Sequence, residues 1–177
     1  MVEVDKVVVG VYRANCYILS KNNKVLVIDP GDEYDKIKPF INNKEIVGVL
    51  ITHKHQDHIG ALNNFDQNKI YSYDNLKEGI NQIPPFTFEV IYTKGHTSDS
   101  ITFYFKEDNL MFTGDFLFKG SIGRMDLPTG NTKEMIKSID KIKKYPNVRI
   151  FPGHGDSTTL EDEKQNNIYF SLKEWYN

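Results

Sequence analysis

Residues 52–58 read Thr52-His53-Lys54-His55-Gln56-Asp57-His58, and they hold three imidazoles and one carboxylate. The other two histidines are His96, in Gly95-His96-Thr97, and His154, in Pro152-Gly153-His154-Gly155. Neutral imidazole is the commonest protein ligand for zinc and related cations, and a His/Asp set favours a divalent transition metal. A lone histidine is more often an ordinary polar side chain, but such a cluster is costly to leave unpaired. We therefore interpret residues 52–58 as a metal-binding motif.

The spacing inside this motif predicts two cation sites. His53 and His55 are two positions apart, so in an extended segment their side chains point to the same side. Asp57 and His58 are adjacent and point in different directions as the chain turns toward a helix. One cation could therefore take the first pair and a second cation the other pair.

Three further residues would complete the two sites from distant segments. His96 and His154 could each complete one of the two sites. Asp115, in Thr113-Gly114-Asp115, could bridge both cations through its two oxygens. Structural zinc sites favour cysteine and full coordination, whereas this set leaves room for water at each ion. The pattern is typical of a catalytic centre with two divalent ions, for which we expect zinc, with iron or manganese as alternatives.

Each metal motif follows a predicted strand, so the motifs should meet at one edge of a sheet pair. Helices on the outer faces of two sheets would account for the nearly continuous apolar strands, and we expect an α/β (α+β) fold. A single domain over residues 1–177 is predicted. The predicted strands are 7–9, 15–19, 25–28, 46–51, 86–92, 101–105, 110–113 and 149–151. The predicted helices are 34–41, capped by Asp32, and 59–65, 132–144 and 161–175.

Composition excludes several classes of function. The 177 residues are 39% apolar and 26% charged with a net charge of −2, so no basic face for nucleic acid is expected. The longest apolar run, 46–51, is far shorter than the roughly 20 residues that span a bilayer, and no secretory signal is evident. Cys16 is the only cysteine and is predicted to be a buried structural thiol. These features predict a cytoplasmic protein.

With these motifs the chain resembles the metallo-β-lactamase superfamily, whose His-x-His-x-Asp-His signature matches residues 53–58. The later motifs at His96, Asp115 and His154 follow in the family order, and the resemblance covers nearly the whole chain. It implies a four-layer αββα sandwich. It also implies a first metal on His53, His55 and His96, a second on Asp57, His58 and His154, and Asp115 as the bridge.

Within that superfamily the chain is similar to the short, single-domain branch of glyoxalase II-like proteins. The segments that carry this similarity are 114–118, 121–128 and 153–160. The similarity implies hydrolysis of a small thioester of the S-D-lactoylglutathione kind by a hydroxide bridging two metals, with Asp57 as the catalytic residue that orients it. Full-length glyoxalase II has a helical C-terminal domain that helps to bind glutathione. Only 23 residues follow His154 here, so we expect no such domain.

Alternative functions keep the same motif. A persulfide dioxygenase resembles this chain in the histidine motif and in Gly123-Arg124-Met125-Asp126, and would hold one iron on His53, His96 and Asp115. Lactone or phosphodiester hydrolysis would need only a different pocket. A non-catalytic binding domain is the least favoured, because no ligand is missing.

Several side chains are candidates for supporting roles. Asp29, Thr52, Thr97 and Ser98 could hold the outer nitrogens of the histidines. Arg124 and Lys119 could face an anionic substrate, although Arg124 is more readily explained by pairing with Asp126. Tyr73, Phe118 and Tyr169 are candidates for lining a substrate slot.

Overall fold

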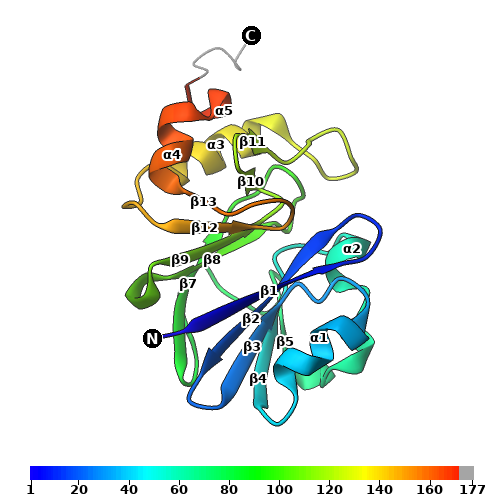
Figure 1. Ribbon diagram of the computed structural model, residues 1–177. Coiled ribbons are helices and arrows are strands. Elements are labelled where there is room, and N and C mark those ends of the chain that lie inside the picture. Colours follow the sequence, from blue (N-terminus) through cyan, green and yellow to red (C-terminus); the bar gives the residue numbers. More distant parts are fainter. Residues whose placement is uncertain (172–177) are drawn as a thin grey trace.

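Two β-sheets form the centre of the fold in the computed structural model, which describes residues 1–171 (Figure 1). The first sheet has the order β1-β2-β3-β4-β5: β1 Glu3–Val9, β2 Ala14–Lys21, β3 Lys24–Ile28, β4 Glu45–Leu50 and β5 Ile70–Tyr71. The second has the order β13-β12-β9-β8-β7-β6: β13 Thr158–Thr159, β12 Arg149–Pro152, β9 Leu110–Gly114, β8 Ile101–Phe105, β7 Phe86–Tyr92 and β6 Gly79–Ile83. A two-stranded ribbon joins β10 Leu117–Phe118 to β11 Ser121–Ile122.

Helices cover the outer faces of both sheets (Figure 1). On the first sheet lie α1 Tyr34–Ile41 and α2 Gln56–Ile59; on the second lie α3 Thr132–Ile142, α4 Leu160–Asn166 and α5 Ile168–Ser171. Three 3₁₀ turns are η1 Leu62–Asn64, η2 Gln67–Lys69 and η3 Lys106–Asp108. The fold is therefore the expected αββα four-layer sandwich.

Apolar side chains fill three layers of core. Between the sheets, Tyr17, Phe103 and Phe112 belong to one buried cluster, in which Tyr17 and Phe112 meet edge to face with ring centroids 5.1 Å apart. A second cluster lies under α3, and a third lies under α1. Because both faces of each sheet are covered, central strands such as β3, β8 and β9 are buried along nearly their whole length, whereas β1 and β6 have exposed positions.

The strand directions explain where the metal motifs meet. Strand β3 pairs parallel with β4, and β9 pairs parallel with β12. Parallel neighbours place their carboxyl ends at the same edge of a sheet. The segments that follow these four strands carry Asp29, residues 53–58, Asp115 and His154, so each sheet brings its part of the set to one edge.

Some predicted elements differ from the structure. Helix α1 is preceded by Glu33, which adopts a left-handed backbone with φ of 45°, so Asp32 is not its N-cap; Asp32 Oδ1 instead accepts from Glu33 N. The helix expected over 59–65 begins earlier as α2 and ends at Ile59, before the separate turn η1. Gly60 lies so close to Gly31 that an added Cβ would be 2.3 Å from the Gly31 carbonyl oxygen.

The last predicted helix, over 161–175, is interrupted. It consists of α4 and α5 with Asn167 extended between them, and residues 172–175 lie outside the described part. The Asn167 side chain donates to Ser121 O and accepts from Tyr169 N, and such bonds compete with helix continuation. Within residues 1–171, no helix is long and apolar enough to cross a bilayer.

Candidate metal centre

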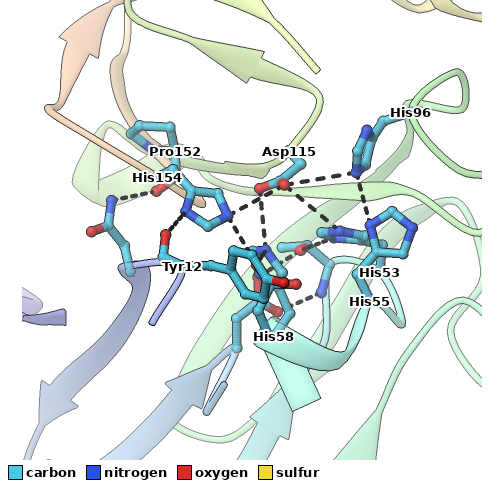
Figure 2. Close-up of polar contacts among 12 residues, drawn as sticks. Tyr12, His53, His55, His58, His96, Asp115, Pro152 and His154 are labelled. Atoms are coloured by element: carbon cyan, nitrogen blue, oxygen red, sulfur yellow. Dashed lines mark hydrogen bonds and ion pairs between the residues drawn. The ribbon is translucent and has the colours of Figure 1, made fainter. Parts of the chain in front are cut away.

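The two sheets bring all seven predicted ligands together at one edge. Figure 2 shows the labelled histidines and Asp115 turned toward one another. His53 and His55 lie in the loop after β4, and Asp57 and His58 lie on α2. His96 comes from the loop between β7 and β8, Asp115 follows β9, and His154 follows β12. Segments that are distant in sequence thus converge on one cluster.

The first group consists of His53, His55 and His96. One nitrogen of each ring lies within 4.8 Å of one nitrogen of each other ring. His96 Nε2 is 3.0 Å from His55 Nδ1. This is the trio that the sequence assigns to a first metal.

The second group consists of Asp57, His58 and His154, whose ligand atoms also lie within 4.8 Å of one another. Asp57 Oδ2 is 3.1 Å from His154 Nε2 and 3.6 Å from His58 Nε2. This trio matches the expected second site.

Asp115 lies between the two groups. Its Oδ1 is 3.2 Å from His58 Nε2, whereas its Oδ2 is 3.7 Å from His96 Nε2 and 4.0 Å from His53 Nε2. Its side chain is thus within reach of both groups, as a bridging carboxylate must be.

Hydrogen bonds on the outer side of four rings determine which nitrogen faces the cluster. The Nδ1 atoms of His96 and His154 donate to the backbone oxygens of Arg124 and Tyr12, at 2.7 and 3.0 Å. Carbonyl oxygens only accept, so these contacts assign a proton to Nδ1, and in the neutral ring the lone pair is on Nε2. The ring orientation therefore suits metal binding through Nε2.

Asp29 orients the other two rings, those of His58 and His53, directly or through Thr52. Its Oδ2 accepts from His58 Nδ1 at 3.0 Å and from Thr52 Oγ1 at 2.6 Å, and its Oδ1 accepts from Thr52 N. Because the Thr52 hydroxyl donates its hydrogen bond to Asp29, the Thr52 oxygen is free to accept a hydrogen bond from His53 Nδ1 at 3.1 Å. Asp29 also lies within 4.8 Å of nitrogens of His53 and His58, but its oxygens already accept these bonds. It is therefore a support and not a ligand.

Burial and charge shift the pKa values of the cluster in opposite directions. Burial lowers the pKa of His53 and His55. Burial also disfavours a charged His58, but Asp115 and Asp29 outweigh it and raise the pKa of this ring. The same balance, with Asp115 and Asp57 as partners, raises the pKa of His154 to about 9.

The carboxylates respond to the neighbouring rings. A hydrogen bond from His154 lowers the pKa of Asp57. Burial alone would raise the pKa of Asp115, but His58 and His154 lower it well below its usual range. Both carboxylates are therefore ionised at neutral pH, which is the form that binds cations.

Unpartnered atoms in the cluster fit a divalent cation. Within residues 1–171, the buried atoms His53 Nε2, His58 Nε2 and Asp115 Oδ1 have no aligned hydrogen-bond partner. Leaving such groups unsatisfied costs about 1–3 kcal/mol each. Cations bound to nitrogen and oxygen would satisfy all three, so the residues present match the expected cofactor chemistry.

The other predicted residues have mixed outcomes. Thr52 and Asp29 support histidines as expected, whereas the contacts described for Thr97 and Ser98 go to Ser100 and Thr129 instead. Arg124 pairs with Asp126 through two 2.7 Å bonds, as favoured from sequence. The backbone oxygens of Tyr12 and Arg124 could not have been anticipated, because a carbonyl has no sequence signature.

The substrate-slot candidates also separate. The Phe118 ring lies 6.1 Å from the His154 ring, so it borders the cluster. Tyr73 instead packs on Tyr92 and accepts a hydrogen bond from Lys94 Nζ at 2.8 Å. Tyr169 packs against the hydrophobic core under α3. Lys119 is exposed. Cys16 is fully buried, and burial raises the pKa of its thiol, as expected for a structural cysteine.

Two similar bacterial proteins are described as hydrolases. The probable metallo-hydrolase YqgX of Bacillus subtilis (strain 168) is 31% identical over 92% of this chain and 95% of its own length. The hydroxyacylglutathione hydrolase GloC of Haemophilus influenzae is 29% identical over 96% of this chain and 99% of its own length.

Two solved structures have the same architecture. The BLEG-1 B3 metallo-beta-lactamase has a TM-score of 0.88 at 25% identity, over 96% of this chain and all of its own. TTHA1623, determined in a di-iron-bound form, has a TM-score of 0.82 at 28% identity, over 92% of this chain and 98% of its own. The family model described as the metallo-beta-lactamase superfamily matches residues 9–78 and 73–154. Motif, fold and match agree, and the chain belongs to the metallo-β-lactamase superfamily.

Proposed function

We propose that this metal-dependent hydrolase uses two divalent ions, with zinc preferred, to cleave a small thioester of the S-D-lactoylglutathione kind. The observation that carries the proposal is the pair of ligand groups with Asp115 between them. Two ions in such an arrangement are typical of hydrolytic centres. The outward hydrogen bonds leave the inner nitrogens free to bind without rearrangement.

The reaction follows from the groups at the centre. Bound divalent ions would supply an acidic water, with its pKa lowered from about 15.7 toward 7, and polarise the substrate carbonyl. Asp57 is half-buried and held by His154 at 3.1 Å, so its carboxylate can accept a hydrogen bond from the attacking water and orient it. A thiolate leaves without protonation. This suits a chain whose five histidines all lie within the two ligand groups.

Two hollows beside the centre support a small substrate. One, of about 240 Å³, is lined by Val11, Tyr12 and Asp57 among others. The other, of about 290 Å³, is lined by Lys6, Arg13 and His154 among others. Both are smaller than the roughly 300–1,000 Å³ of typical ligand pockets, so each could hold only a small group. The name of the Haemophilus influenzae relative, which matches over nearly its whole length, supports glutathione as the thiol carrier.

A second candidate is persulfide oxidation with one iron. It would use His53, His96 and Asp115. Asp115 Oδ2 lies 4.0 and 3.7 Å from the Nε2 atoms of the two rings, so a single ion could take these three. This candidate leaves the second group without a task, and we therefore rank it below the hydrolase.

Metal content and substrate turnover together test the proposal. The protein is purified without added metal and its zinc, iron and manganese are measured per chain. It is then assayed against S-D-lactoylglutathione, other thioesters, a lactone, a phosphodiester and a β-lactam. About two ions per chain and preferential thioester hydrolysis are expected. One iron per chain with oxygen uptake on a glutathione persulfide, and no thioester hydrolysis, would overturn the proposal in favour of the second candidate.

A further inference from the structure

Strand β2 buries the polar groups of Asn15 and Tyr17 at its start. Asn15 and Tyr17 are 1% and 2% exposed, although each carries hydrogen-bonding groups that are costly to bury without partners. Neither belongs to the ligand groups. The question is which partners they have.

Their partners lie on the other sheet, in the segment that carries His154. Tyr17 Oη donates to Pro152 O at 2.6 Å. Asn15 Nδ2 lies 3.0 Å from both Pro152 O and Gly155 O, and 3.1 Å from Tyr17 Oη. Its two protons therefore reach carbonyls on both sides of His154. Burial raises the pKa of the Tyr17 phenol well above its usual value, so the phenol remains a donor.

Backbone contacts reinforce the same junction. Asn15 N donates to Gly153 O at 2.7 Å, and Ala14 forms an isolated antiparallel bridge with His154. Further along, Gly153 N donates to Gly114 O at 2.8 Å. The segment around His154 is thus fixed between β2 of the first sheet and β9 of the second.

The available space makes this position demanding. A Cβ on Gly153 would lie 2.2 Å from Asp115 Oδ1 and 2.7 Å from His58 Cε1. A small displacement of the segment would therefore make Gly153 collide with Asp115 or His58. In the other direction it would move His154 Nε2 away from Asp57 Oδ2, which is 3.1 Å distant. The first group, by contrast, has no residue on this segment.

We infer that Asn15 and Tyr17 are positioning residues for the second metal, because they hold the His154 segment from the opposite sheet. The inference rests on the proposed function, since it presupposes that the group Asp57, His58 and His154 binds an ion. According to this inference, the hydrogen bonds from β2 strengthen binding of the second ion and do not change binding of the first.

The test is a metal titration that does not depend on activity. Apoprotein is titrated with Zn²⁺ and, for the spectrum of each site, with Co²⁺. The variants are Asn15→Ala and Tyr17→Phe, and circular dichroism checks that they are folded. Asn15→Ala should weaken the second ion about 10- to 100-fold, the usual effect of removing a supporting hydrogen bond, and leave the first unchanged. Tyr17→Phe keeps the ring in the core and should weaken the same ion about 2- to 10-fold.

Matched controls separate positioning from general destabilisation. Asn167 is also buried and donates to Ser121 O and Glu163 Oε2, and Tyr145 also donates its hydroxyl, to Glu89. Asn167→Ala and Tyr145→Phe should bind both ions as the wild type does. Wild-type affinity for the second ion in folded Tyr17→Phe and Asn15→Ala, or equal weakening of both ions, would overturn the inference. If Asn15→Ala does not fold, Tyr17→Phe decides. A wild-type protein that binds no divalent ion would instead overturn the proposed function.

Discussion

Asp29 controls the orientation of two histidines without belonging to either ligand group. It accepts a hydrogen bond from His58 directly and another from Thr52, whose hydroxyl oxygen accepts from His53. In Asp29→Asn, an amide nitrogen would face Thr52 Oγ1 and His58 Nδ1. The amide nitrogen donates and cannot accept, so it cannot replace the two hydrogen bonds that the carboxylate accepts. The His58 proton should then move to Nε2, which faces the second group. We expect the second ion to bind about 10- to 100-fold more weakly, measured by Zn²⁺ titration.

The control for this variant is Asp66→Asn at the surface. The Asp66 side chain accepts from the backbone and side-chain nitrogens of Asn68 in the turn η2, and it lies outside the two ligand groups. This variant should titrate like the wild type. Identical titrations of Asp29→Asn and wild type would show that Asp29 does not set the ring orientation.

His58 is the predicted ligand whose removal would distinguish a two-metal mechanism from a one-metal mechanism. It is fully buried, and it lies in the second group near Asp115. His58→Ala should lower the metal content from two ions to one and reduce thioester hydrolysis by more than about 100-fold. Elemental analysis and kcat/KM measure the two effects. Full activity with a single bound ion would rule out the two-metal mechanism.

At the scale of elements, the close approach of β12 to the end of β9 is a packing requirement. Gly153→Ala places a methyl group 2.2 Å from Asp115 Oδ1, so the His154 segment must move. Loss of the second ion is expected in a metal titration, with a lower melting temperature. Gly155→Ala is the comparison, because its φ of 75° would be strained for alanine, whereas an added Cβ would meet no atom within 4 Å. It should cost about 1–2 kcal/mol of stability while keeping both ions. Equal metal loss in the two variants would contradict the packing explanation.

At the scale of the molecule, the cations would join the two sheets. Residues 53–58 follow the first sheet, whereas His96, Asp115 and His154 follow strands of the second. Ions that bind only the folded state stabilise it, by about 2.7 kcal/mol at 100 times the dissociation constant. Adding Zn²⁺ to chelator-stripped protein should therefore raise the melting temperature by about 5–10 °C in scanning calorimetry. Mg²⁺, which prefers oxygen ligands, should have little effect. Equal shifts with both ions would argue against a site rich in imidazole.

The sequence by itself determined the candidate ligand set and the class of fold. Residues 53–58, His96, Asp115 and His154 identify themselves by residue type, and strands that are apolar throughout predict covered sheets. Short strands such as β5 and β13 have no such signal, because two residues cannot show a period. The interruption at Asn167 was also missed, since it depends on a contact with Ser121, which is distant in sequence.

Only the tertiary structure decided which nitrogen of each ring faces the cluster and what holds it there. The acceptors include the backbone oxygens of Tyr12 and Arg124, which any residue could supply. Asn15 and Tyr17 likewise look like parts of an ordinary strand until β2 meets the His154 segment. The physical reason is common to all of them. Residue types specify which chemistry is available, but the direction of a lone pair depends on hydrogen bonds that form only when the two sheets pack together.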